Sequence, residues 1–188
     1  FIGTSWGLVV PLTKIAVSGG YQPFGLIFWQ MVIGAIVLGV INAVRRRPLP
    51  MHGRVIFFYI AFALIGTIIP NGASYKAYTV LPAGIMSLLL SLIPMMAFPI
   101  ALILGLDRFS LKRMIGLSLG LLAILLIVGM PDALPNAAML AFIPLGLLAS
   151  FMYAFEGNFV AHFGTGGVGP LQLLLGSSIV GAVISAPI

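Results

Sequence analysis

Six long stretches of this 188-residue chain contain no charged residue, and this pattern constrains its fold more than any other feature. One stretch separates Lys14 from Arg45, and another separates Lys76 from Asp107. A helix needs about 20 mostly apolar residues to cross the hydrocarbon core of a bilayer. Only 6% of all residues are charged, against roughly a quarter in a typical soluble domain. We therefore predict an all-α integral membrane protein surrounded by lipid, because a spanning helix satisfies its own backbone hydrogen bonds.

Seven apolar segments are predicted to cross the membrane. Short turns rich in Gly and Pro separate them, and no hydrophilic segment is long enough to form a soluble domain. Asn136 is predicted to cap the sixth helix, and Ser110 the fifth. The predicted spans are residues 1–18, 24–44, 55–74, 83–104, 114–130, 137–159 and 168–188.

The distribution of Lys and Arg predicts the orientation. Seven of the nine lie in the loops after the second and fourth spans, which share one side if the spans alternate. Lys14 and Lys76 lie toward the other side. Because cytoplasmic loops are enriched in Lys and Arg, we predict a cytoplasmic N-terminus in a cell inner (plasma) membrane. The net charge of +6 therefore indicates topology and not nucleic-acid binding. The seven are Arg45, Arg46, Arg47, Arg54, Arg108, Lys112 and Arg113.

A shift of 147 residues aligns the first predicted hairpin with the last one without a gap. Six of the 32 aligned positions are identical, and Trp6 falls on Tyr153. Five spans separate the copies, and an odd number inverts the second copy in the membrane, as in many secondary transporters. We predict a five-helix repeat over residues 1–131 and the truncated start of its partner over 137–188, within a ten-span protein. Chance similarity of two apolar hairpins is the alternative. The identical pairs are Gly19/Gly166, Gly20/Gly167, Pro23/Pro170, Leu26/Leu173, Gly34/Gly181 and Ala35/Ala182.

Several short motifs resemble EamA-type members of the drug/metabolite transporter superfamily, and together they cover the whole chain. Two positions depart from the family's usual residues: Asp107 stands where Glu is common, and Gln30 where Arg is common. The matching motifs are Trp6-Gly7 with Pro11 and Lys14, residues 75–79 followed by Pro82-Ala83-Gly84, residues 87–94, and residues 105–110 followed by Ile115-Gly116-Leu117.

The resemblance implies a ten-helix carrier with a central cavity that works by alternating access. Such carriers move amino acids, other metabolites or drugs, commonly outward. We therefore expect a secondary active transporter of small organic solutes, with efflux as the expected direction. The diffuse motifs identify no substrate and no coupling ion.

Glu156 is the acidic residue that lies well inside a predicted span, about one turn from its end. An ionisable group at such a depth is a functional candidate by default. Glu156 would bind a proton or pair with a cationic substrate. The alternatives are hydration near the cytoplasm and an ion pair with His162.

Other polar and aromatic side chains are candidates for a substrate-binding wall. Lys14 follows Pro11, which interrupts its helix, so this lysine either lines a cavity or extends to the headgroups, as Lys76 is expected to do. The aromatic candidates contact a substrate or belong to an interfacial belt, and the belt is favoured for Tyr78 and also considered for Tyr75. The full candidate set is Trp6, Pro11, Lys14, Gln30, Asn71, Tyr75, Tyr78, Ser91, Tyr153 and Glu156.

Enzymatic signatures are missing from the sequence. Two His, three acidic residues and no Cys provide no convincing metal cluster or catalytic triad, so neither an enzyme nor a cofactor is expected. A membrane-embedded enzyme, a lipid-handling protein and a non-transporting helix bundle remain alternatives. Proton coupling is open, and so is a homodimer, for which Gly116 and Gly120 supply a GxxxG motif.

Overall fold

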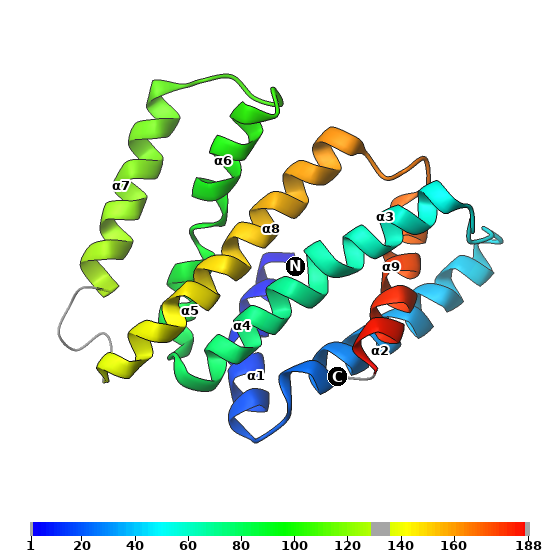
Figure 1. Ribbon diagram of the computed structural model, residues 1–188, viewed down its shortest axis with the longest axis horizontal. Coiled ribbons are helices and arrows are strands. Elements are labelled where there is room, and N and C mark those ends of the chain that lie inside the picture. The colour runs from blue at the N-terminus through cyan, green and yellow to red at the C-terminus, as the bar shows by residue number, and fades with distance from the viewer. Residues whose placement is uncertain (1, 129–135, 187–188) are drawn as a thin grey trace.

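The computed structural model describes residues 2–128 and 136–186, with the backbone alone at residues 2–6, 128 and 137. Every regular element in these ranges is helical, and no strand occurs among them (Figure 1). Four helical segments are long and apolar enough to cross a membrane: Pro23–Val44, Gly53–Val80, Ala83–Ile103 and Ala138–Phe163. Shorter apolar helices cover Gly7–Ser18 and Pro170–Ser185. The predicted all-α membrane fold is confirmed.

The helices follow the predicted spans closely in order and position. The first, second, fifth and seventh spans are α1 (Ile2–Ser18), α2 (Pro23–Val44), α7 (Leu111–Val128) and α9 (Pro170–Ser185). The third span is α3 (Gly53–Ala63), η1 (Leu64–Ile68) and α4 (Ile69–Val80). The fourth is α5 (Ala83–Leu90) and α6 (Ile93–Ile103), and the sixth is η2 (Ala137–Phe142) and α8 (Ile143–Phe163).

The third span contains a turn of π-helix, η1, just before Pro70. Proline has no N–H, so an α-helical bond from residue 70 to the carbonyl of Gly66 cannot form. The helix widens here instead, and the N–H of Ile69 donates to the carbonyl of Leu64, five residues back. Helix then continues to Val80, so Lys76 lies on an exposed helical face one turn before the end.

The fourth span is interrupted where α5 ends at Leu90, before Pro94. By contrast, α1 runs unbroken through Pro11, so the predicted interruption of that helix is wrong. Asn136 is confirmed as a cap, because its side chain accepts a 2.9 Å hydrogen bond from the N–H of Ala138, although the turn that follows is 3₁₀-helical. Ser110 directly precedes α7, which begins three residues before the predicted start at Met114.

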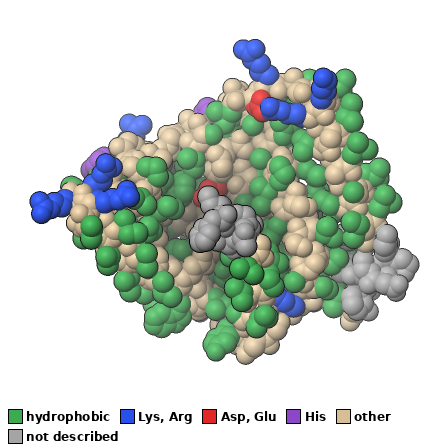
Figure 2. All heavy atoms as spheres, turned by 180° about the vertical axis from the view of Figure 1, so that it is seen from behind, with side chains coloured by type: hydrophobic (Ala, Val, Ile, Leu, Met, Phe, Trp, Pro, Cys, Tyr) green, Lys and Arg blue, Asp and Glu red, His purple; other side chains and the backbone are tan. Residues whose placement is uncertain are grey.

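The loops that carry the basic residues lie toward one side of the molecule. Figure 2 shows Lys and Arg side chains along the upper and left margins, with hydrophobic side chains over most of the face below. The α2–α3 loop meets the start of α9, where Gln172 Nε2 donates a 2.6 Å hydrogen bond to the carbonyl of Pro48. This arrangement is what the alternating spans require, and the direction of the protein in the membrane stays a prediction. The predicted loop around Asp132 lies outside the described residues.

Helix α4 lies at the centre of the packing and contacts α1, α2, α5 and α8. A large buried cluster surrounds it, and Tyr75 and Tyr78 of α4 both belong to this cluster. A second, smaller cluster joins α3 to α9 through Phe58, Tyr59 and Leu173. The long helices α8 and α3–α4 run side by side across the molecule, which brings residues far apart in sequence to one place (Figure 1).

Candidate functional site

A cavity of about 360 Å³ lies among α1, α2, the η1–α4 segment and α8. Six of the ten predicted site residues line it, although they come from three different predicted spans. These six are Gln30, Asn71, Tyr75, Tyr78, Tyr153 and Glu156. The remaining lining residues are Val9, Val10, Thr13, Gly66, Thr67, Ser74, Leu90 and Leu174. Helix packing thus places the polar candidates at a single site inside an otherwise apolar bundle.

A chain of hydrogen bonds connects α8, α4 and α2 along one wall of the cavity. Tyr153 Oη donates to Asn71 Oδ1 at 2.5 Å, and Asn71 Nδ2 in turn donates to Gln30 Oε1 at 3.4 Å. Tyr75 Oη donates to the same Gln30 oxygen at 3.0 Å. Side-chain networks of this kind hold their members in fixed orientations, because an unpaired buried polar group is costly. The wall therefore presents amides and phenol hydroxyls that are already oriented.

Glu156 carries the one carboxylate that lines the cavity, and no Lys, Arg or His side chain lines it. The residue is half-buried and lies seven positions before the end of α8, or about 10 Å at 1.5 Å per residue. It is thus about one turn deeper than predicted. Among the described residues Glu156 takes part in no ion pair, and the predicted alternative of a pair with His162 is not formed.

Gly66, in the π-helical turn η1, lies directly against this carboxylate. A Cβ atom built on Gly66 would be 2.5 Å from Glu156 Oε1, closer than any real Cβ contact. The absence of a side chain at residue 66 is therefore what allows the Glu156 side chain to occupy its position. The sequence analysis missed Gly66 and its neighbour Thr67, and the signal that points to them is the proline four residues after the glycine.

Lys14 neither lines this cavity nor extends to the headgroups. Its Nζ donates a 2.6 Å hydrogen bond to the carbonyl of Tyr78, in the last turn of α4. Carbonyls in the last turn of a helix lack helical partners and carry partial negative charge, so an ammonium group there is favourable. Tyr75 and Tyr78 are 9% and 3% exposed, so their predicted placement in a lipid-facing aromatic belt is wrong.

Two other predicted residues, Pro11 and Ser91, line a separate hollow between α1 and α5. The Ser91 hydroxyl donates to the carbonyl of Leu88 at 2.7 Å, within its own helical turn, and not to a neighbouring helix. The side chain of Trp6 lies outside the described part of the chain.

One family model matches the chain: that of the EamA-like transporter family, over residues 1–129. The comparisons with curated proteins and with solved structures gave no match. The matched range covers the helices from α1 to α7, and with them every cavity residue that precedes α8.

Proposed function

The chain belongs to the EamA-like transporter family, and on that premise we propose that it is a secondary active transporter of small organic solutes. The observation that carries the proposal is the cavity, in which six polar and aromatic side chains from different helices converge within an apolar bundle. Its volume of about 360 Å³ lies in the range of roughly 300–1,000 Å³ typical of small-molecule sites. Metabolites, amino acids and compact drug-like molecules fit this description.

The charge of the cavity favours solutes that carry a positive group. Glu156 supplies a carboxylate, the cation of Lys14 is held at the end of α4, and Gln30 is neutral. Tyrosine rings attract cations through their faces, and Tyr75, Tyr78 and Tyr153 all line the cavity. An organic amine or ammonium compound with further hydrogen-bonding groups would satisfy both kinds of wall.

Alternating access is supported by the similarity of the two hairpins α1–α2 and α8–α9. Gly20 and Gly167, equivalent under the 147-residue shift, have φ angles of +90° and +87°, a region that favours glycine. The helices that follow these turns begin at the equivalent residues Pro23 and Pro170. We therefore retain the proposal of one repeat over residues 1–131 and the start of an inverted partner over 137–188. Inverted repeats that move against each other around a central site are a common basis for transport.

Glu156 is also the group on which proton coupling would depend. A carboxylate that holds either a proton or the substrate cation, but not both, links the movement of one to the return of the other. An inward proton gradient would then drive export. Export and a location in the inner membrane are part of the proposal.

Flux measurements on the full-length protein in vesicles test the proposal. A panel of labelled organic cations, neutral solutes and organic anions would be offered with and without a proton gradient. We expect saturable flux for at least one cation. Glu156→Gln should lower it by about tenfold or more, because losing one partner of a buried charge pair costs about 2 kcal/mol or more. Asp107→Asn is the control, since Asp107 lies outside the cavity. Absence of saturable flux for every solute would contradict a carrier.

A further inference from the structure

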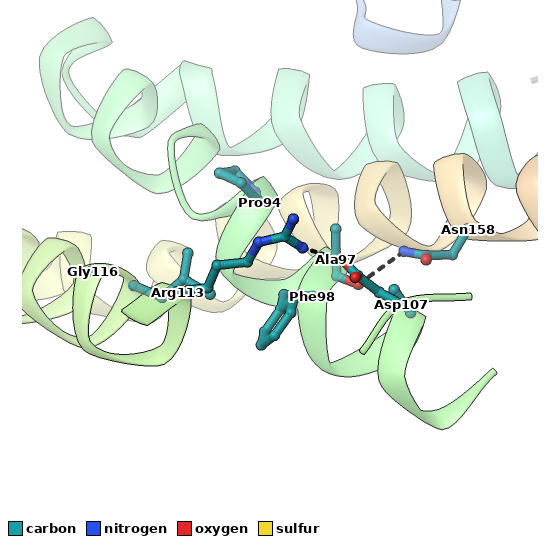
Figure 3. A pocket seen from close by; sticks show the side chains of 9 residues that line it. Pro94, Ala97, Phe98, Asp107, Arg113, Gly116 and Asn158 are labelled. Atoms are coloured by element: carbon teal, nitrogen blue, oxygen red, sulfur yellow. Dashed lines mark hydrogen bonds and ion pairs between the residues drawn. The ribbon is translucent and has the colours of Figure 1, made fainter. Parts of the chain in front are cut away.

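A second hollow, a groove between α6, α7 and α8, lies apart from the transport cavity and shares no lining residue with it. Its volume is about 450 Å³, and its walls are mostly apolar. Figure 3 shows Arg113 extending from α7 toward Asp107, with Phe98 and Asn158 on neighbouring helices. The lining residues are Pro94, Ala97, Phe98, Ala101, Asp107, Arg113, Gly116, Leu117 and Asn158.

The groove exists because small residues line α6 and α7 where these helices separate. Ala97 and Ala101 face it from α6, and a Cβ built on Gly116 of α7 would meet no atom within 4 Å. One turn further along, Gly120 is covered, since a Cβ there would lie 2.4 Å from Met95 Cε. The GxxxG motif is therefore divided: Gly120 serves the α6–α7 contact, and Gly116 is left open to the groove.

The groove also has a fixed rear wall on α8. Asn158 Nδ2 donates to the carbonyl of Ala97 on α6 at 3.1 Å and to that of Ala154 at 2.9 Å. Both protons of this amide are thus used to hold α8 against α6, at a residue that is 7% exposed. The floor of the groove is therefore held in place before any ligand binds.

The open end of the groove lies at the strongly basic α6–α7 loop. Three cations, Arg108, Lys112 and Arg113, stand against the single acid Asp107, which leaves two net positive charges. Arg113 pairs with Asp107 and lies 6.0 Å from the centre of the Phe98 ring. Arg108 and Lys112 have no acidic partner among the described residues. Basic groups at the membrane surface attract anionic headgroups.

From the loop, the groove runs inward along α6 from Ala101 to Pro94. These seven residues correspond to about 10 Å of helix, or about two thirds of the roughly 15 Å that one leaflet contributes to the hydrocarbon core. An apolar channel of this length with a cationic end matches a lipid, which has an acyl chain below its phosphate. A free phosphate ion would leave the apolar walls unoccupied.

We propose that this groove binds an anionic phospholipid, with one acyl chain along α6 and α7 and the headgroup phosphate at Arg108 and Lys112. Native mass spectrometry of the full-length protein in detergent, with phosphatidylglycerol or phosphatidylcholine of identical chains, tests this. We expect severalfold more bound phosphatidylglycerol. The double variant Arg108→Gln/Lys112→Gln should lose this preference, and the matched variant Arg45→Gln/Arg46→Gln should keep it. Equal binding of the two lipids, or equal loss in both variants, would overturn the proposal.

A second pair of variants tests the acyl-chain part without changing any charge. Gly116→Leu fills the groove, and Gly157→Leu adds the same side chain at an exposed position on α8 that also has no atom within 4 Å. We expect phosphatidylglycerol binding to fall severalfold in the first variant and to persist in the second. Unchanged binding in Gly116→Leu, or displacement of the lipid by millimolar inorganic phosphate, would show that the headgroup charge alone is recognised and would refute a lipid groove.

Discussion

A Cβ atom built on Gly181 of α9 would lie 2.7 Å from Met31 Sδ of α2. The same contact recurs in reverse: a Cβ on Gly34 of α2 would lie 3.3 Å from Ser178 Oγ of α9. The 147-residue shift places Gly34 on Gly181 and Met31 on Ser178. The contact between the two helices therefore maps onto itself when they are exchanged, as in an interface with two-fold symmetry. This geometry supports the proposed inverted repeat independently of sequence identity.

Enlarging Gly181 should destabilise the α2–α9 contact. We expect Gly181→Leu to lower the free energy of unfolding by about 1–3 kcal/mol, the usual cost of overpacking. Met31→Ala in the same chain should restore part of the loss, because it frees the space that the leucine needs. Thermal unfolding of the two single variants and the double variant in detergent measures this coupling. Strictly additive effects would show that the two residues do not share the contact.

Adding a methyl group at Gly66 should displace the carboxylate of Glu156. The new Cβ would lie 2.5 Å from Glu156 Oε1, so one of the two groups must move. We expect Gly66→Ala to reduce saturable flux strongly, and Glu156→Asp in the same chain to restore part of it, since the shorter side chain leaves room. Gly157→Ala, which meets no atom within 4 Å, is the control. Full flux in Gly66→Ala would separate this glycine from the function of Glu156.

Removing the Lys14 cation should affect stability and not substrate affinity. Its ammonium group bonds the Tyr78 carbonyl at the end of α4 and does not line the cavity. We expect Lys14→Met to cost about 1.5–3 kcal/mol of unfolding free energy, the range for hydrogen bonds to charged groups. The exposed Lys76→Met should cost little. Unfolding midpoints and the KM for transport check both halves, and a large rise in KM for Lys14→Met would place this lysine at the substrate.

The proposed orientation is directly accessible because the chain contains no Cys. In intact cells, a membrane-impermeant maleimide should label Lys76→Cys, which faces the exterior in the proposed topology. Arg46→Cys, in the α2–α3 loop, should react only after the cells are opened. The reverse pattern would invert the protein in the membrane and place the basic loops outside. Flux of an unlabelled control substrate would show that both variants remain folded.

The sequence by itself determined which segments cross the membrane, where the charged loops lie and where the two hairpins turn. These properties depend on local composition: charge is excluded from the hydrocarbon core, and a glycine marks the turn at Gly20 and again at Gly167. The membrane-spanning helices and the cap at Asn136 were predictable for the same reason. The hydrogen-bonding role of Lys14 was not predictable, because its partner Tyr78 lies 64 residues away in sequence.

Only the tertiary structure decided which side chains face one another. In a membrane protein the surfaces toward lipid and toward neighbouring helices are both apolar, so hydrophobic patterning does not identify the buried face of a helix. This explains why Tyr78 was assigned to the lipid boundary and is in fact buried. The approach of Gly66 to Glu156 requires α8 to pack against a π-helical turn from another span. Local sequence specifies the turn, but only packing brings the carboxylate to it.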